Sequence, residues 1–274
     1  MTKRCVWLSG RFMDPERARV PATSLAVTHG VGAFETMRIV RGHAPLIALH
    51  AARLATTCRA LDLPLEPRDW GSIVAELARR NGLANGVVRL TVGPEFALAT
   101  TRRHRRGLAT ERREGVGLQT LKLQRGAAGI KSTSWLPLVL AERTAGDEVL
   151  LTGERGALLE ATRSNFFALT SRGLETAPTP LVLPGIGRGL VVELARGLGI
   201  KVIVRAPQRR AIPEFREAFI TNAVAGVRPV HSIDATRFAV RRDSLCFELQ
   251  RQLDARMGLR RGSSPPAPAP KRRG

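Results

Sequence analysis

The sequence predicts a mixed α/β (α+β) protein of two domains, a small α+β domain over residues 1–117 and a larger α/β domain over 118–258. The 274 residues suffice for two compact cores. Short β-branched strands and amphipathic helices fill the first part of the chain, whereas strands alternate with helices in the second. A hydrophobic content of 43% with mixed charge is typical of a globular protein.

The hydrophobic pattern predicts the elements of the small domain. Residues 6–12 and 38–43 are typical of short strands with turns between them. Apolar residues three and four apart predict a helix over 47–61, and a second helix begins at Trp70 and ends at Asn81-Gly82. The run VVRLTV at 87–92 predicts a strand.

In the larger domain, the pattern predicts a helix over 188–198 and strands at 149–151, 166–169, 202–204 and 218–220. From Arg251 onwards the sequence is polar and loses its periodicity. Residues 259–274 are basic and rich in Pro and Ala, a composition that cannot bury a core, so we expect a disordered tail.

The formal net charge of +21 raises the alternative of a nucleic-acid partner. However, the arginines are spread along the chain, only 4% of the residues are aromatic and tyrosine is absent, so base-stacking platforms are difficult to build. We expect a solvated arginine-rich surface and no specific nucleic-acid binding. The dense basic run at 102–113 either binds an acidic substrate or is plain surface.

The sequence predicts a cytoplasmic protein. Its N-terminus, MTKRCVWLSGRF, lacks the apolar stretch of a signal peptide, and no segment approaches the length of a membrane span. Cys5, Cys58 and Cys246 are scattered, without the spacing of a zinc site or a disulfide framework. We therefore expect no metal and a reducing compartment.

Separated motifs carry chemical information through their order: GAFETMR at 32–38, HAARL at 50–54, GIKS at 129–132, EATRSNF at 160–166, LPGIGR at 183–188 and TNA at 221–223. This series resembles the class IV aminotransferase family, the fold-type IV enzymes that use pyridoxal 5′-phosphate (PLP). The family includes branched-chain and D-amino-acid aminotransferases and 4-amino-4-deoxychorismate lyase. The resemblance covers residues from about 6 to 236. It implies a D-amino-acid aminotransferase-like fold, with a small α+β domain, a larger pseudobarrel domain, the cofactor between them, and a homodimer.

The resemblance depends most on Lys131. A lone lysine is ordinarily a solvated surface charge. Here it follows Gly-Ile and precedes Ser-Thr-Ser-Trp-Leu-Pro, the context in which the family places its Schiff-base lysine. Such an amine must be desolvated or near positive charge to be nucleophilic at neutral pH. The resemblance implies that Lys131 both holds the cofactor and moves the proton of the α-carbon of an amino-acid-like substrate.

The resemblance implies that Glu160 pairs with the pyridine nitrogen and keeps it protonated, so that the ring remains an electron sink. The alternative is an exposed carboxylate at a strand end. Asn165 matches the family's Ser-Asn pair near the cofactor, where we expect a supporting role.

The family binds the PLP phosphate at the turn that matches Leu183, Gly185, Ile186 and Gly187, which leads into a helix beginning near Arg188. Unpaired N–H groups and the helix dipole suit such a turn to an anion. Leu183 would pack under the ring. Without the resemblance, a proline-glycine turn before a helix is only a turn.

Other residues complete the expected cofactor site. Family members often carry threonine where this chain has Gly187, and Thr221, followed by Asn222, could supply a hydroxyl instead. Arg53 could form a charge-assisted pair with the phosphate. His50 shares a helix face with Arg53, and we expect it to be structural.

Thr36 is the second catalytic candidate. If residues 34–38 form a strand, then Phe34, Thr36 and Arg38 lie on one side and Thr36 can face the substrate. The alternative is that this stripe is ordinary core.

The FETMR string and the segments TNA and GVRPV are more similar to the lyases than to the branched-chain enzymes, and the chain has no tyrosine of the kind those enzymes place near the ring. Against this, residues 93–107 lack the glycine-rich Arg-Gly motif of many lyases. The sequence therefore favours aminodeoxychorismate lyase, in folate biosynthesis, with a branched-chain or D-amino-acid transaminase as the alternative. A non-catalytic family member and a nucleic-acid-binding protein are the remaining hypotheses.

Overall fold

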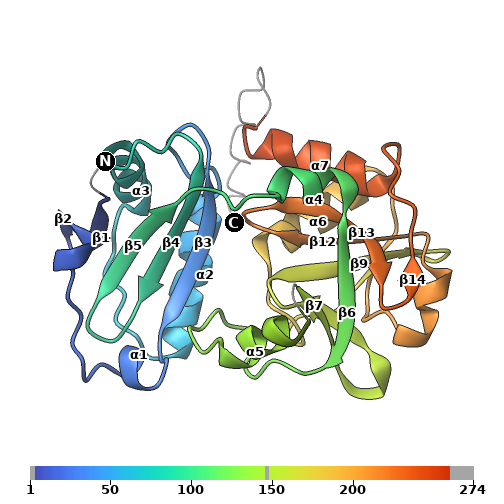
Figure 1. Ribbon diagram of the computed structural model, residues 1–274, viewed down its shortest axis with the longest axis horizontal. Helices are drawn as coiled ribbons and strands as arrows, with labels where there is room; N and C mark the ends of the chain where they lie inside the picture. The colour runs from blue at the N-terminus through green and yellow to red at the C-terminus, as the bar shows by residue number, and fades with distance from the viewer. Residues whose placement is uncertain (1–3, 146–147, 260–274) are drawn as a thin grey trace, which may run out of the picture.

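The computed structural model describes residues 4–145 and 148–259. Two β-sheets, each with its own helices, lie side by side (Figure 1). Apart from Leu259, the predicted tail lies outside the described residues.

The first sheet has five antiparallel strands in the order β2-β1-β5-β4-β3. They are β1 (Val6–Leu8), β2 (Arg11–Met13), β3 (Ala33–Ile39), β4 (Gly86–Val92) and β5 (Ala97–Arg102). The helices of this part are η1 (Pro15–Arg17), α1 (Leu25–Thr28), α2 (Ile47–Ala60) and α3 (Trp70–Arg80). The helices predicted over 47–61 and from Trp70 are confirmed, and α3 has its C-cap at Asn81, as expected.

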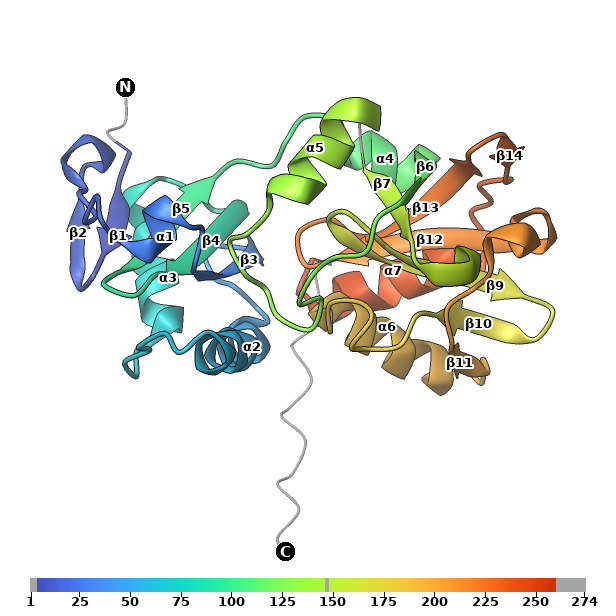
Figure 2. The ribbon, with the colours of Figure 1, turned by 90° about the horizontal axis from the view of Figure 1, so that it is seen from below.

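Helices α2 and α3 cover one face of this sheet (Figure 2). They pack Leu54 and Leu77 against Met37 and Ile39 of β3. Because side chains alternate along a strand, Phe34 and Thr36 point to the opposite face. Since β3 is also the edge strand nearest the second part of the molecule, that face is available to a site between the two parts (Figure 1).

The second sheet has nine strands and closes on itself, because β8 pairs with both β7 and β9. Its strands are β6 (Val116–Lys122), β7 (Val149–Thr152), β8 (Leu158–Ala161), β9 (Ser164–Thr170), β10 (Gly173–Thr176), β11 (Val202–Val204), β12 (Glu217–Asn222), β13 (Gly226–Ile233) and β14 (Thr236–Arg237). The helices are α4 (Leu108–Glu114), α5 (Leu136–Ala145), η2 (Glu154–Gly156), α6 (Ile186–Gly197), η3 (Arg209–Glu214) and α7 (Leu245–Arg256). The expected pseudobarrel is confirmed.

Alternation along the central strands divides the core of this part into two layers. Phe166 of β9 and Ile220 of β12 fill the barrel interior. Their neighbours Phe167 and Phe219 stack outside it, 5.1 Å apart between ring centroids, beneath α6 and α7. A strand buried on both faces reads as a continuous apolar run, which explains why the sequence around 166–169 is apolar throughout.

Several elements differ from the sequence prediction, among them α5, α6 and α7. Helix α6 begins at Ile186 and not near Arg188, because the chain becomes helical directly after Gly185. Helix α7 runs to Arg256, past the point where periodicity was expected to end, because Leu249 and Leu253 still bury one narrow stripe on an otherwise polar helix. Helix α5 was not predicted.

The division of the chain at residue 117 stays a proposal. Helix α4 packs against β13, and β6 pairs in parallel with β13 and β7, so the elements from α4 onward accompany the second sheet. These pairings favour a boundary shortly after Arg102.

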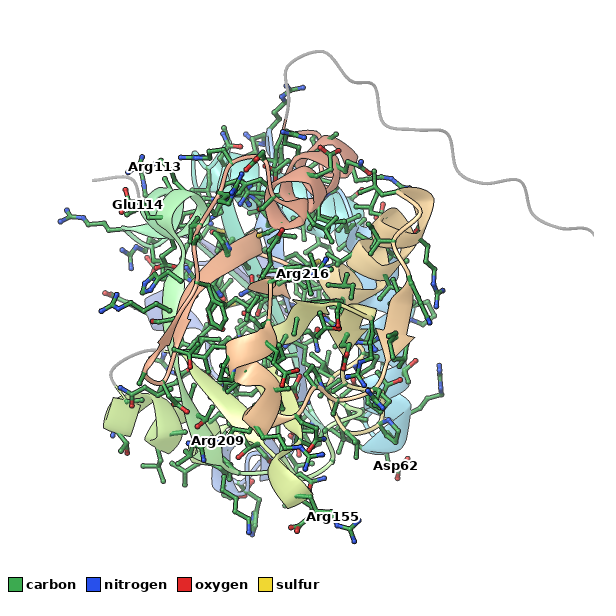
Figure 3. The ribbon with its side chains drawn as sticks, turned by 90° about the vertical axis from the view of Figure 1, so that its right-hand side faces the viewer. Asp62, Arg113, Glu114, Arg155, Arg209 and Arg216 are labelled. Atoms are coloured by element: carbon green, nitrogen blue, oxygen red, sulfur yellow. The ribbon has the colours of Figure 1, made fainter. Side chains whose placement is uncertain are left out.

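Many arginines lie on the solvated surface. Figure 3 shows Arg113 and Arg155 at opposite edges of one face, with Arg209 and Arg216 between them, and all four are exposed. In the part of the chain that the structure describes, no helix is long and apolar enough to cross a membrane.

Candidate active site

A cavity of about 440 Å³ lies where β3 faces the barrel. It is lined by β3, α2, the segment around Lys131, strands β8 and β9, the turn before α6 and the turn after β12. Every residue named above as a catalytic or cofactor-binding candidate is on its wall: Thr36, Arg53, Lys131, Glu160, Asn165, Leu183, Gly185, Ile186, Gly187, Thr221 and Asn222. The structure therefore brings together residues that are spread over nearly 190 positions of the sequence.

The backbone of Lys131 is fixed against the first sheet. Its carbonyl accepts a hydrogen bond from the Phe34 N–H at 3.0 Å, and its N–H donates to Thr57 Oγ1 at 3.2 Å. Ser132 forms a single bridge with Ala33. The segment around Lys131 is thus held firmly against β3, and a reacting side chain needs such a rigid support.

The Lys131 ammonium group lies among aromatic rings and other cations. Nζ is 4.6 Å from the centre of the Phe34 ring and 5.4 Å from that of Trp135. Burial, helped by the positive charges of Arg53 and Arg125, lowers the pKa of Lys131 to about 7. A large fraction of the amine is therefore neutral, and nucleophilic, at physiological pH.

Glu160 is a buried carboxylate with its two oxygens in different surroundings. Oε2 accepts hydrogen bonds from the Leu183 N–H at 3.0 Å and from Asn165 Nδ2 at 3.3 Å. Oε1 has no hydrogen-bond partner among the described residues, and its nearest cation is Arg125, with NH1 at 3.7 Å. Burial raises the pKa of Glu160, against the effect of Arg125. Oε1 can thus accept a hydrogen bond from a ligand.

The turn before α6 is shaped by two glycines. A Cβ on Gly185 would lie 1.8 Å from Asn165 Oδ1, and a Cβ on Gly187 would lie 2.9 Å from Thr221 Oγ1. Gly185 is the N-cap of α6, and no side chain caps the first N–H groups of this helix. Thr221 Oγ1 is buried and without a hydrogen-bond partner among the described residues. A helix N-terminus next to an unpartnered hydroxyl can hold an anion.

Glu35 is a residue of this site that the sequence interpretation missed. It is completely buried, and it accepts hydrogen bonds at 2.7 Å from both Nε and NH2 of Arg53 and at 2.6 Å from His50 Nδ1. Burial would raise its pKa, but Arg53 and His50 outweigh that effect and lower the pKa to about 2. The sequence does contain a sign of this contact. Glu35 lies in an expected strand, and the helix that follows it carries His50 and Arg53 on one face.

These contacts show how Arg53 and His50 are held. Arg53 also donates from NH1 to the Pro184 carbonyl at 3.0 Å, which ties α2 to the turn before α6. His50 is buried behind it, away from the cavity wall, and burial lowers its pKa. That position suits the structural role we expected.

Four arginines, which we call the arginine wall, also line the cavity: Arg89, Arg102, Arg105 and Arg163. All four are solvent-exposed; partial desolvation lowers the pKa of Arg102, and the neighbouring charges of Arg163 and Arg105 lower it further. Partial desolvation and Arg102 do the same for Arg89, whose guanidinium lies 3.7 Å from the centre of the Phe34 ring. The dense basic run at 102–113 thus contributes Arg102, Arg105 and Leu108 to the cavity wall.

The residues present fit PLP. The ring nitrogen requires an acidic partner and finds Glu160 Oε1, the phosphate requires donors and finds Thr221 Oγ1 with the N-terminus of α6, and the aldehyde requires a neutral amine and finds Lys131. The absence of a Cβ at Gly185 and Gly187 lets Asn165 and Thr221 approach the turn closely.

The comparisons with known proteins agree with this geometry. Residues 32–233 match the family model described as amino-transferase class IV. The chain is 28% identical over 252 residues to a putative branched-chain-amino-acid aminotransferase of Methanocaldococcus jannaschii, with 84% of this chain and 88% of that protein covered. It is 22% identical over 262 residues to an aminodeoxychorismate lyase of Bacillus subtilis, with 85% and 88% covered. The branched-chain amino acid aminotransferase structure from Escherichia coli superposes with a TM-score of 0.82 over 97% of each chain at 22% identity.

The fold and the cavity together define a PLP-dependent enzyme of fold type IV. The chain belongs to the amino-transferase class IV family, as its motifs indicated.

Proposed function

We propose that this enzyme is a 4-amino-4-deoxychorismate lyase, which removes pyruvate from its substrate and leaves 4-aminobenzoate. The arginine wall carries this proposal. Among the described residues, neither Arg89 nor Arg102 forms an ion pair with a carboxylate, although both lie in a cluster of like charges. Bound carboxylates would offset that repulsion. Aminodeoxychorismate carries two, one on the ring and one on the enolpyruvyl group, whereas a branched-chain side chain carries none.

PLP, when bound, supplies an electron sink for the pair of electrons left at the substrate carbon that loses its proton. Lys131 takes that proton from carbon 4 of the substrate, because its lowered pKa leaves it neutral near pH 7. The protonated amine is then a donor for the enolpyruvyl group as the C3–O bond breaks. Thr36 lies on the same wall as Phe34 and can orient the substrate by its hydroxyl.

The remaining residues hold the reactants. Glu160 and Asn165 would bind the ring nitrogen side of the cofactor, and Leu183 with the glycine turn would bind its lower face and its phosphate. Thr221 and Asn222 would add contacts to the phosphate side. Arg53 supports the turn through the Pro184 carbonyl and lies on the cavity wall, where it can also reach an anion.

A direct assay tests the proposal. Purified protein saturated with PLP is given enzymatically prepared aminodeoxychorismate, and pyruvate and 4-aminobenzoate are measured. We expect equal amounts of the two products without any added keto acid. Activity that appears only with a keto acid would contradict the lyase assignment.

The relatives favour a second candidate, an amino-acid transaminase. The 28% identity to the Methanocaldococcus jannaschii protein is higher than the 22% identity to the Bacillus subtilis lyase. The same arginine wall would then favour an acidic amino donor over an aliphatic one. Keto-acid-dependent turnover of amino acids distinguishes this candidate.

We also propose a cytoplasmic homodimer. The family resemblance supports the dimer, and the unpaired cysteines suit a reducing compartment. Light scattering of the purified holoenzyme tests the dimer, and a mass of about one chain would contradict it.

A further inference from the structure

Arg228 is a buried arginine that the proposed mechanism does not use. It lies on β13 with only 1% of its surface exposed. Because Val230 fills the barrel interior, Arg228, two residues earlier, points to the same side. It also lines the wall of the cavity.

The guanidinium joins three elements. NH1 donates to Glu111 of α4 at 2.8 Å, and NH2 donates to Glu148 and, at 2.9 Å, to Ser164 Oγ of β9. Burial alone would lower the pKa of Arg228, but Glu148 and Glu111 outweigh it and raise the pKa. An arginine spreads its donors over three nitrogen atoms in a fixed plane, whereas the three donors of a lysine all lie on one atom.

One branch of this network leads to the turn after β12. Asn222 donates to Ser164 Oγ at 3.0 Å. Its own oxygen accepts from the N–H groups of Val224 at 3.0 Å and Ala225 at 2.7 Å. Residues 222–225 all line the cavity, so Ser164 connects Arg228 to a whole section of the wall.

The other branch leads to the arginine wall. Glu111, which accepts from Arg228, also forms an ion pair with Arg105. The next residue of α4, Arg112, donates to the Ala225 carbonyl. Helix α4 therefore touches both the cavity turn and Arg105, and Arg228 is the buried point at which the two branches meet.

We infer that Arg228 is a positioning residue, which sets the substrate-binding geometry by holding the 222–225 turn through Ser164 and Arg105 through Glu111. The inference rests on the proposed acidic substrate only for the role of Arg105. The turn is fixed by Arg228 whatever the substrate is.

The kinetic test uses Arg228→Met, which keeps an unbranched apolar stem and removes the guanidinium fork. We expect KM to rise about tenfold with PLP at saturation while kcat changes less than about threefold, since a displaced wall weakens binding before it alters the proton transfer. The KM of Arg228→Lys should lie between those of Arg228→Met and the wild type. Arg256→Met, which breaks the surface pair with Glu193, is the matched control and should leave KM unchanged. An unchanged KM in Arg228→Met would overturn the inference.

A second readout does not depend on activity. Hydrogen exchange of the peptide covering 221–227 should be about tenfold faster in Arg228→Met holoenzyme, because Asn222 loses its anchor, while β4 keeps its exchange rate. If Arg228→Met does not fold, Arg228→Met with Glu148→Gln removes the buried negative charge as well and serves in its place. Wild-type exchange at 221–227 in a folded variant would overturn the inference. Failure of the wild type on aminodeoxychorismate, by contrast, would count only against the proposed lyase.

Discussion

Arg53 and Glu35 form a two-point ion pair across the small domain, with Nε and NH2 of the arginine each 2.7 Å from a carboxylate oxygen. The pair joins α2 to β3, and Arg53 extends it to the carbonyl of Pro184 in the second part of the molecule. The turn expected to bind the phosphate is therefore positioned from a buried carboxylate in the other sheet.

Replacing Glu35 should destabilise the protein. Glu35→Gln leaves Arg53 without its buried partner, and we expect the free energy of unfolding at pH 7 to fall by about 3 kcal/mol. Urea denaturation measures this. Glu76→Gln, which removes a partly exposed surface carboxylate paired with Arg79 and Arg80, is the control and should change the midpoint little.

The same pair has a defined pH dependence. The pKa of Glu35 is about 2 in the folded protein, against an ordinary value of 4.5. Its stabilisation is complete above pH 4.5 and is lost as the pH falls towards 2, because the unfolded carboxylate takes up its proton first. The acid-induced loss of stability should be shallower in Glu35→Gln, and an identical slope would count against the pair.

Lys131 should react with amine reagents at a lower pH than an ordinary lysine. Its pKa of about 7 implies that modification of the cofactor-free protein by trinitrobenzenesulfonate speeds up between pH 6 and 8 and then levels off. Mass spectrometry of the Lys131 peptide follows the rate, with exposed Lys201 as the internal reference. A rate that keeps rising steeply above pH 9 would show that burial does not lower this pKa.

Glu160 should be needed for turnover and not for attachment of the cofactor. In Glu160→Gln the ring nitrogen loses its acidic partner, and we expect kcat to fall about a hundredfold or more while Lys131 still binds PLP. Glu175→Gln removes another buried glutamate, which lies off the cavity wall and pairs with Arg172. This control should retain its kcat, and equal losses in the two variants would indicate a general effect on folding.

The glycine turn offers a matched pair of alanine variants. Gly185→Ala places a Cβ against Asn165 Oδ1, and we expect PLP affinity to fall about tenfold or more. Gly189→Ala lies on the same helix with nothing within 4 Å of the new Cβ, so affinity should stay the same and stability should rise by up to about 1 kcal/mol. Fluorescence titration with PLP compares them, and equal affinities would mean that the turn does not contact the cofactor.

The sequence predicted the local elements well where one face is apolar. In α2 and α3 the apolar residues recur every three or four positions, and β4 is rich in β-branched residues. Each of these patterns is contained within one short stretch of sequence. The sequence did not predict α7, because the buried stripe of this helix is narrow and Arg and Gln surround it.

The meeting of the site residues could not be derived from local patterns. Lys131 and Glu160 belong to different segments, and only the resemblance of ordered motifs placed them together. Arg228 shows the limit most clearly. With 44 Lys and Arg residues in the chain, nothing marks this one as buried until Glu111 and Glu148, 117 and 80 positions away, are seen beside it.

The site at which PLP becomes attached can be identified directly. The protein is incubated with PLP, reduced with borohydride and digested, and the modified peptide is identified by mass spectrometry. We expect the label on Lys131, and we expect Lys131→Ala to lose both the label and the visible absorption band. A label on Lys122 or Lys201 in place of Lys131, or no label at all, would contradict it.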